Sequence, residues 1–169
     1  STGRRASSWE PLDLSAHLDG SHVAEVPALL ARSDGQCLLY PGRVHSLHGE
    51  SESGKSWVAL AAAAAQLDAG EGVLMLDFES DAATVVGRLL RLGVDPTAIR
   101  DRFDYRRPES DPRSLAGDRD VWAGLLARPY ALAVLDGVTE ALSIYGVTSK
   151  DNDEVTGWIR STPRALAAA

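Results

Sequence analysis

Cysteine is almost absent from this sequence: Cys37 is the only one in 169 residues. A single cysteine cannot form an internal disulfide or a thiolate metal site, so we expect a protein of a reducing compartment, the cytoplasm. Long apolar runs are also missing. The longest aliphatic run, residues 58–65, is far shorter than the about 20 residues that cross a bilayer, and we expect no membrane partner.

Positive charge is scarce as well. The net charge is −7, and the only lysines are Lys55 and Lys150. This balance argues against a protein that coats nucleic acid by electrostatics alone. The 44% of hydrophobic residues is enough for a globular domain with a core. We expect this core at residues 36–169, after a polar leader at residues 1–35 with short helical pieces.

Apolar strands alternate with helical segments after Gln36. We predict strands at residues 37–40, 44–47, 72–78, 103–107 and 131–135, with a turn at 41–43 joining the first two. Helices are predicted at 57–69, 81–92, 118–127 and 151–160. This alternation predicts an α/β fold with a mostly parallel sheet flanked by helices. The segments GVLMLDF and ALAVLDG lack polar alternation, which indicates strands covered on both faces.

The pattern G-x-x-x-x-G-K-S occurs at residues 49–56, as Gly49-Glu50-Ser51-Glu52-Ser53-Gly54-Lys55-Ser56. Glycines allow the backbone to curl so that its N–H groups face phosphate oxygens, and a following helix adds its positive N-terminal end. Lys55 is expected to reach the β- and γ-phosphates, and the Ser56 hydroxyl to hold Mg²⁺. A predicted strand precedes the loop and a helix follows it, so we interpret it as an ATP-binding loop.

Two acidic strand ends complete the candidate site. Asp136 follows an apolar strand, where a carboxylate can hold the water shell of Mg²⁺. Glu79 follows the strand after the loop helix, where a carboxylate can orient the attacking water. Strand alternation would place Asp77 and Glu79 on one side of that strand. The residues alone leave a second interpretation open, a solvated acidic strand end with Ser80 or Asp81 as cap of the next helix.

Other candidates are interpreted as structural. His45 and His48 have no spacing that suits a metal site. Trp57, Trp122 and Trp158 are expected between helices and sheet. The arginines between residues 88 and 107 are expected mostly on solvated helix faces.

Four segments, GESESGKS, LMLDFES, VVGRLLRLGVDPTAIRDRF and LAVLDGVTEAL, resemble in order and spacing the AAA family ATPases of the RecA-like, RepA-helicase-like group. The resemblance covers about residues 36–160 and implies a RecA-like P-loop fold. It implies Mg²⁺-dependent ATP hydrolysis with Lys55 and Ser56 at the nucleotide and metal, Glu79 as catalytic glutamate and Asp136 as second acidic motif. It also implies a DNA helicase or other DNA-processing motor, working as a homo-oligomeric ring.

The sequence departs from that family at its end. In the family another core strand follows the last helix, and it lies between the P-loop strand and the strand that ends at Asp136. This chain stops where that strand should begin, so we expect an incomplete core that contacts DNA through regions absent from the chain. The 44–47 strand and the Asp136 strand should then leave a gap or pair directly, and direct pairing would shift Asp136 by ~4.8 Å. A P-loop small-molecule kinase, with residues 100–107 as its lid, and a non-catalytic nucleotide-binding module are the alternatives.

Overall fold

Three parallel strands form the centre of the structure, in the spatial order β4–β3–β5. They are β3 (Val73–Asp77), β4 (Phe103–Arg106) and β5 (Leu132–Asp136). All five residues of β3 are buried, as expected for a central strand covered on both faces. The structure is a computed structural model that describes residues 9–169, so the first eight residues of the predicted leader lie outside the described part.

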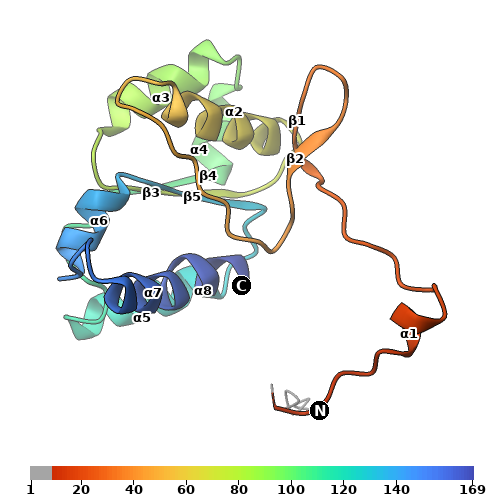
Figure 1. The fold of residues 1–169 in the computed structure, drawn as a ribbon. Helices are drawn as coiled ribbons and strands as arrows, with labels where there is room; N and C mark the ends of the chain where they lie inside the picture. Colours follow the sequence, from red (N-terminus) through yellow and green to blue (C-terminus); the bar gives the residue numbers. More distant parts are fainter. Residues whose placement is uncertain (1–8) are drawn as a thin grey trace.

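Helices cover both faces of this sheet (Figure 1). One layer holds α2 (Lys55–Asp68), α3 (Ala82–Arg91) and α4 (Pro96–Arg102). The other holds α5 (Ala116–Leu126), α6 (Val138–Ile144), α7 (Asn152–Ser161) and α8 (Pro163–Ala167). The predicted α/β fold with a parallel sheet between helices is therefore confirmed.

Side chains that alternate along β3 build two separate cores. Val73 and Met75 pack with α2 and α3, whereas Leu74 and Leu76 pack with α5, α6 and α7. Leu74 is fully buried, and burial of such a side chain contributes about 1.5–3 kcal/mol. The alanines of α2 allow this helix to approach the sheet closely, since Ala63 and Ala64 are buried against it.

Local capping signals fix where several helices begin. Asp81 accepts a hydrogen bond from the Thr84 N–H (3.0 Å) at the start of α3, so Asp81, rather than Ser80, is the cap of this helix. Asp151 caps α7 in the same way. Asp95 caps α4, which has Pro96 in its first turn. Helices α4, α6 and α8 are absent from the sequence-based prediction.

The predicted hairpin of residues 37–40 and 44–47 is wrong. Strand β2 (Cys37–Leu39) pairs instead with β1 (Leu29–Ala31), in antiparallel register. The Tyr40 N–H donates to a side-chain acceptor, Nε2 of His45 (3.0 Å), and not to a backbone carbonyl of residues 44–47, and the two rings stack. Residues 44–47 find no ladder partner and form no strand.

The outer edge of β5 carries no further strand among the described residues. Direct pairing of β5 with residues 44–47 does not occur, and because those residues form no strand, the expected gap between two strands does not arise either. Asp136 is therefore not displaced by direct pairing; it lies opposite Asp77 in the β3–β5 register.

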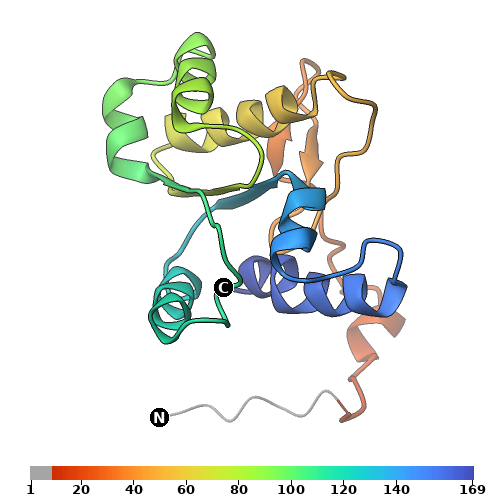
Figure 2. The same cartoon turned by 90° about the vertical axis from the view of Figure 1, so that its left-hand side faces the viewer.

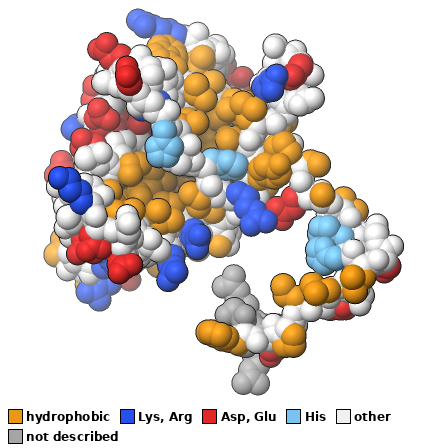
Figure 3. All heavy atoms as spheres, viewed as in Figure 1, with side chains coloured by type: hydrophobic (Ala, Val, Ile, Leu, Met, Phe, Trp, Pro, Cys, Tyr) orange, Lys and Arg blue, Asp and Glu red, His pale blue; other side chains and the backbone are white. Residues whose placement is uncertain are grey.

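The leader differs from its prediction in part. One short helix, α1 (Ser15–Leu18), is present, but Leu29–Ala31 forms a strand rather than a helical piece. Residues 9–28 extend away from the sheet and its helices (Figures 1 and 2). Apolar side chains are exposed along this arm (Figure 3), namely Trp9, Leu12, Leu14, Leu18, Val23 and Val26. Across residues 9–169, no helix combines the length and apolarity that a bilayer crossing requires.

Candidate active site

The loop before α2 has the curled backbone that its glycines predicted. Gly54 adopts φ +86°, and Glu52 adopts φ +60°, both in the left-handed region. A Cβ atom at Gly49 would lie 2.7 Å from Oγ of Ser53, so a side chain at that position would require the Ser53 hydroxyl to move. Residues 49–53 are exposed, and the mouth of the loop is open to a ligand.

Lys55 folds back across this loop. Its Nζ donates to the carbonyl oxygen of Gly49 (2.9 Å), to that of Glu50, and to Oγ of Ser53 (3.3 Å). The ammonium group therefore lies inside the curve of the loop, held by weak neutral acceptors rather than by a carboxylate. An anionic oxygen in the loop would be a stronger acceptor for the same donors.

Helix α2 begins without any competing group at its N-terminus. Gly54 provides no side-chain cap, and the first turn contains no acidic residue. In α3, α4 and α7, by contrast, an aspartate accepts from the first N–H groups. The first N–H groups of a 14-residue helix, with the positive end of its dipole, therefore remain available to an anion beside Lys55 and Ser56.

The two predicted carboxylates lie next to each other at the carboxyl ends of β3 and β5. The Phe78 N–H donates to the carbonyl oxygen of Asp136 (3.0 Å), and a Cβ atom at Gly137 would lie 2.9 Å from Cβ of Glu79. Neither the Asp136 nor the Glu79 side chain has a hydrogen-bond or ion-pair partner within the described part of the chain. Figures 1 and 2 place the start of α2 on this same side of the sheet.

Asp77 does not share the exposed position of Glu79. It is fully buried, and its Oδ1 accepts from the N–H groups of Glu79 (3.1 Å) and Ser80 (2.8 Å). Its Oδ2 accepts from the Tyr105 hydroxyl (2.9 Å) on β4. Strand alternation does not extend to Glu79 because β3 ends at Asp77. Asp77 thus holds the turn that presents Glu79 to solvent.

Burial, together with the hydrogen bond to Asp77, raises the pKa of Tyr105 from 10.0 to about 12. The folded state keeps this proton more tightly than the unfolded state, so its stabilisation is complete below pH 10 and is lost as the pH rises through about 12. We expect the difference in unfolding free energy between wild type and Tyr105→Phe to shrink over this range. Urea unfolding of both proteins at successive pH values measures it, and a difference independent of pH would contradict it.

Gly137→Ala should destabilise the fold by about 2–4 kcal/mol, because the added methyl group would clash with Glu79 and because the backbone of residue 137 has a left-handed conformation. Gly137 has φ +81°, and the methyl would also lie 3.1 Å from the Glu79 nitrogen. Gly70→Ala is a matched control with φ +83° and no atom within 4 Å of the added methyl. Denaturant unfolding should show a loss of only about 1–2 kcal/mol in unfolding free energy for the control. Equal losses in the two variants would contradict the close contact with Glu79.

Two tryptophans that were predicted between helices and sheet differ in burial. Trp158 is buried, but Trp57 is 38% exposed on the first turn of α2, which corrects its predicted core position. The Arg88 guanidinium lies over the exposed Trp57 ring, 5.5 Å from its centre, and makes a cation–π contact with it. Within residues 9–169, no three His, Cys, Asp or Glu side chains gather as a metal site.

Comparison with protein-family models and with curated proteins gives no match for this chain. The candidate site comprises the loop at residues 49–54, the uncapped start of α2, and the carboxylates of Glu79 and Asp136, which have no partner among the described residues. The Asp77–Tyr105 contact was missed from the sequence, where the only signal was an acid at the end of a buried strand.

Proposed function

We propose that this chain binds ATP in the loop at residues 49–56 and hydrolyses its terminal phosphate with Mg²⁺. The observation that carries the proposal is the start of α2, where uncapped N–H groups and the Lys55 ammonium face the same glycine-bounded loop. Within the described residues neither of these two positive features has a carboxylate partner, and together they match a polyphosphate.

Binding would exchange the hydrogen-bond partners of Lys55. Its Nζ now donates to two backbone carbonyls and the Ser53 hydroxyl. Phosphate oxygens carry negative charge and form shorter, stronger bonds with an ammonium group. The backbone N–H groups of the loop and of the first turn of α2 would bind the remaining oxygens, so the loop is already arranged for the ligand.

Hydrolysis would use Glu79 to orient and polarise the attacking water. Its side chain is exposed and unpartnered among the described residues, while the Asp77 turn and the Gly137 contact fix its backbone. Ser56 and Asp136 provide the two oxygen donors that would hold Mg²⁺, directly or through water. When bound, Mg²⁺ would neutralise charge on the phosphates. Asp136 lies beside Glu79, so the metal ligand and the water-orienting acid would act on one phosphate.

A finer assignment belongs to the same proposal. The order of the four segments supports a RecA-like P-loop core from a DNA helicase or other DNA-processing motor, assembled as a homo-oligomeric ring and placed in the cytoplasm. The kinase alternative is weakened because Arg100 and Arg102 lie at the end of α4, directly before β4, and so at the amino-terminal ends of the strands.

Binding of a fluorescent ATP analogue, followed by phosphate release with Mg²⁺, tests this function. Turnover that single-stranded DNA stimulates favours the motor. Transfer of phosphate to a small hydroxyl-bearing acceptor would replace the ATPase with a kinase. Saturable binding without any turnover would leave a nucleotide-binding module, and no saturable binding would overturn the proposal.

A further inference from the structure

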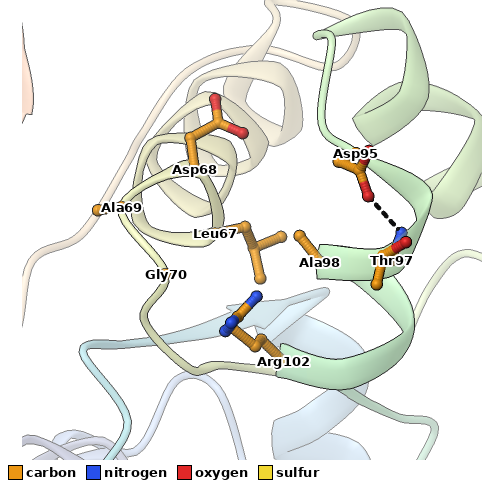
Figure 4. Close-up of a pocket in the computed structure, with 8 residues that line it drawn as sticks. All are labelled: Leu67, Asp68, Ala69, Gly70, Asp95, Thr97, Ala98 and Arg102. Carbon is orange, nitrogen blue, oxygen red and sulfur yellow. Dashed lines mark hydrogen bonds between the residues drawn. The ribbon is translucent and has the colours of Figure 1, made fainter.

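Two adjoining depressions lie at the amino-terminal ends of the strands, away from the loop at residues 49–56. The first, of about 460 Å³, lies between the end of α2 and the start of α4 (Figure 4). The second, of about 490 Å³, lies beside the starts of β4 and β5. Gly70 and Arg102 line both depressions. We call the second one the arginine groove, because its lining includes Arg100, Arg102, Arg106 and Arg128.

A single carboxylate organises one wall of the arginine groove. Asp104, whose side chain is 17% exposed, accepts from Nε of Arg106 (2.6 Å) and Nη1 of Arg128 (3.2 Å). The Tyr130 hydroxyl donates to the same carboxylate (2.6 Å). Although burial raises the pKa of Asp104, the hydrogen bonds from Arg106 and Tyr130 lower it below its usual value. An ionised Asp104 thus holds two guanidinium groups in place.

These guanidinium groups keep donors for a ligand. Each carries five N–H donors; Arg106 uses two nitrogens on Asp104 and Arg128 only one. Arg102 has no hydrogen-bond or ion-pair partner among residues 9–169, and Figure 4 shows its guanidinium pointing toward Leu67, near the junction of the two depressions. Planar guanidinium groups match the oxygens of a phosphate.

Charge in the arginine groove opposes that of the whole chain. Four arginines face two carboxylates there, Asp101 and Asp104, which gives a local excess of two positive charges in a protein of net charge −7. Phe103 and Tyr130 add aromatic walls. A positive hollow with aromatic sides is typical of sites for phosphate groups attached to a base and sugar.

We propose that the arginine groove is a second anion site, which binds a phosphate group carried by a nucleotide or by single-stranded nucleic acid. The site is separate from the loop at residues 49–56 and does not depend on the proposed ATPase function. Asp104 is a positioning residue for it, and Arg102, Arg106 and Arg128 provide the donors.

The test measures binding of ATP without metal and of a fluorescent oligothymidylate to the Lys55→Ala variant, so that the loop contributes little. Adding Arg102→Ala and Arg128→Ala should raise the Kd of at least one probe by about tenfold or more, since each substitution removes charge-assisted hydrogen bonds. The fold should persist, because Asp104 keeps Arg106 and Tyr130, and thermal melting checks this. If only the affinity for ATP falls, the natural ligand is a nucleotide. If only the affinity for the oligonucleotide falls, the natural ligand is a single-stranded nucleic acid.

Arg91→Ala with Arg160→Ala, in the same background, is the matched control: both arginines are exposed, and neither lines the groove. Equal losses in the control would reduce the effect to net charge and overturn the site. Absence of saturable binding of either probe to Lys55→Ala would overturn it too. An unaltered ATP affinity in Lys55→Ala that then falls with the groove variants would support the groove while contradicting the proposed loop function.

Discussion

Lys55→Ala should raise the Kd for ATP by about 100-fold or more, because it removes the only cationic side chain in the loop at residues 49–56. The lost donor now reaches the Gly49 carbonyl and the Ser53 hydroxyl inside the curve of the loop. Each charge-assisted hydrogen bond to phosphate is worth about 1.5–3 kcal/mol, and Nζ can make more than one. Titration with a fluorescent ATP analogue measures the change.

Lys150→Ala is the matched control, since Lys150 is the only other lysine and is exposed beyond the end of α6. It removes the same charge and should leave ATP affinity unchanged. Thermal melting shows whether Lys55→Ala keeps the fold when its bonds to the loop are lost. A folded Lys55→Ala protein with wild-type affinity would contradict the assignment of the loop as the ATP site.

The elements that local sequence specifies were predicted well. Helices α2, α3 and α7 begin within two residues of their predicted starts, because glycine or aspartate marks each boundary in the chain itself. Strands β3 and β5 were predicted because continuous apolar runs require cover on both faces. Even the missed helix α4 had a local signal, the pair Asp95-Pro96, which provides its cap and first turn.

Elements that depend on a distant partner were harder to predict. Residues 44–47 have the composition of a strand, but a strand forms only where another one offers its N–H and C=O groups. β2 takes β1 as its partner, and β5 is not paired with residues 44–47. Strand pairing depends on the assembled fold, so the residues around position 45 do not determine it by themselves.

The same division applies to the candidate site. The loop at residues 49–56 is contiguous, so the sequence alone could place its glycines, Lys55 and Ser56. The Asp77–Tyr105 hydrogen bond spans 28 positions. The arginine groove draws its residues from three separate segments of the chain. Single arginines on helix and strand ends look like solvated charges until the fold brings them around Asp104.

Glu79→Gln should retain ATP binding but slow hydrolysis by about 10²-fold or more, the usual loss when a general base is removed. The glutamine keeps the size of the side chain and its backbone contacts with Asp77 and Gly137. It lacks the negative charge that would polarise the attacking water. Phosphate release at saturating ATP, together with the Kd of the fluorescent analogue, separates the loss of turnover from any loss of binding.

Glu71→Gln is the matched control, because Glu71 is also exposed but precedes β3, at the opposite end of the sheet from Glu79. Normal turnover is expected for it. Wild-type turnover in Glu79→Gln would contradict the role of Glu79 and pass it to another carboxylate. Asp77 is unsuited to that role, since it is buried and its oxygens already accept from two N–H groups and the Tyr105 hydroxyl. Asp136, half-buried beside Gly137 and unpartnered within residues 9–169, would then be the acid that acts on water.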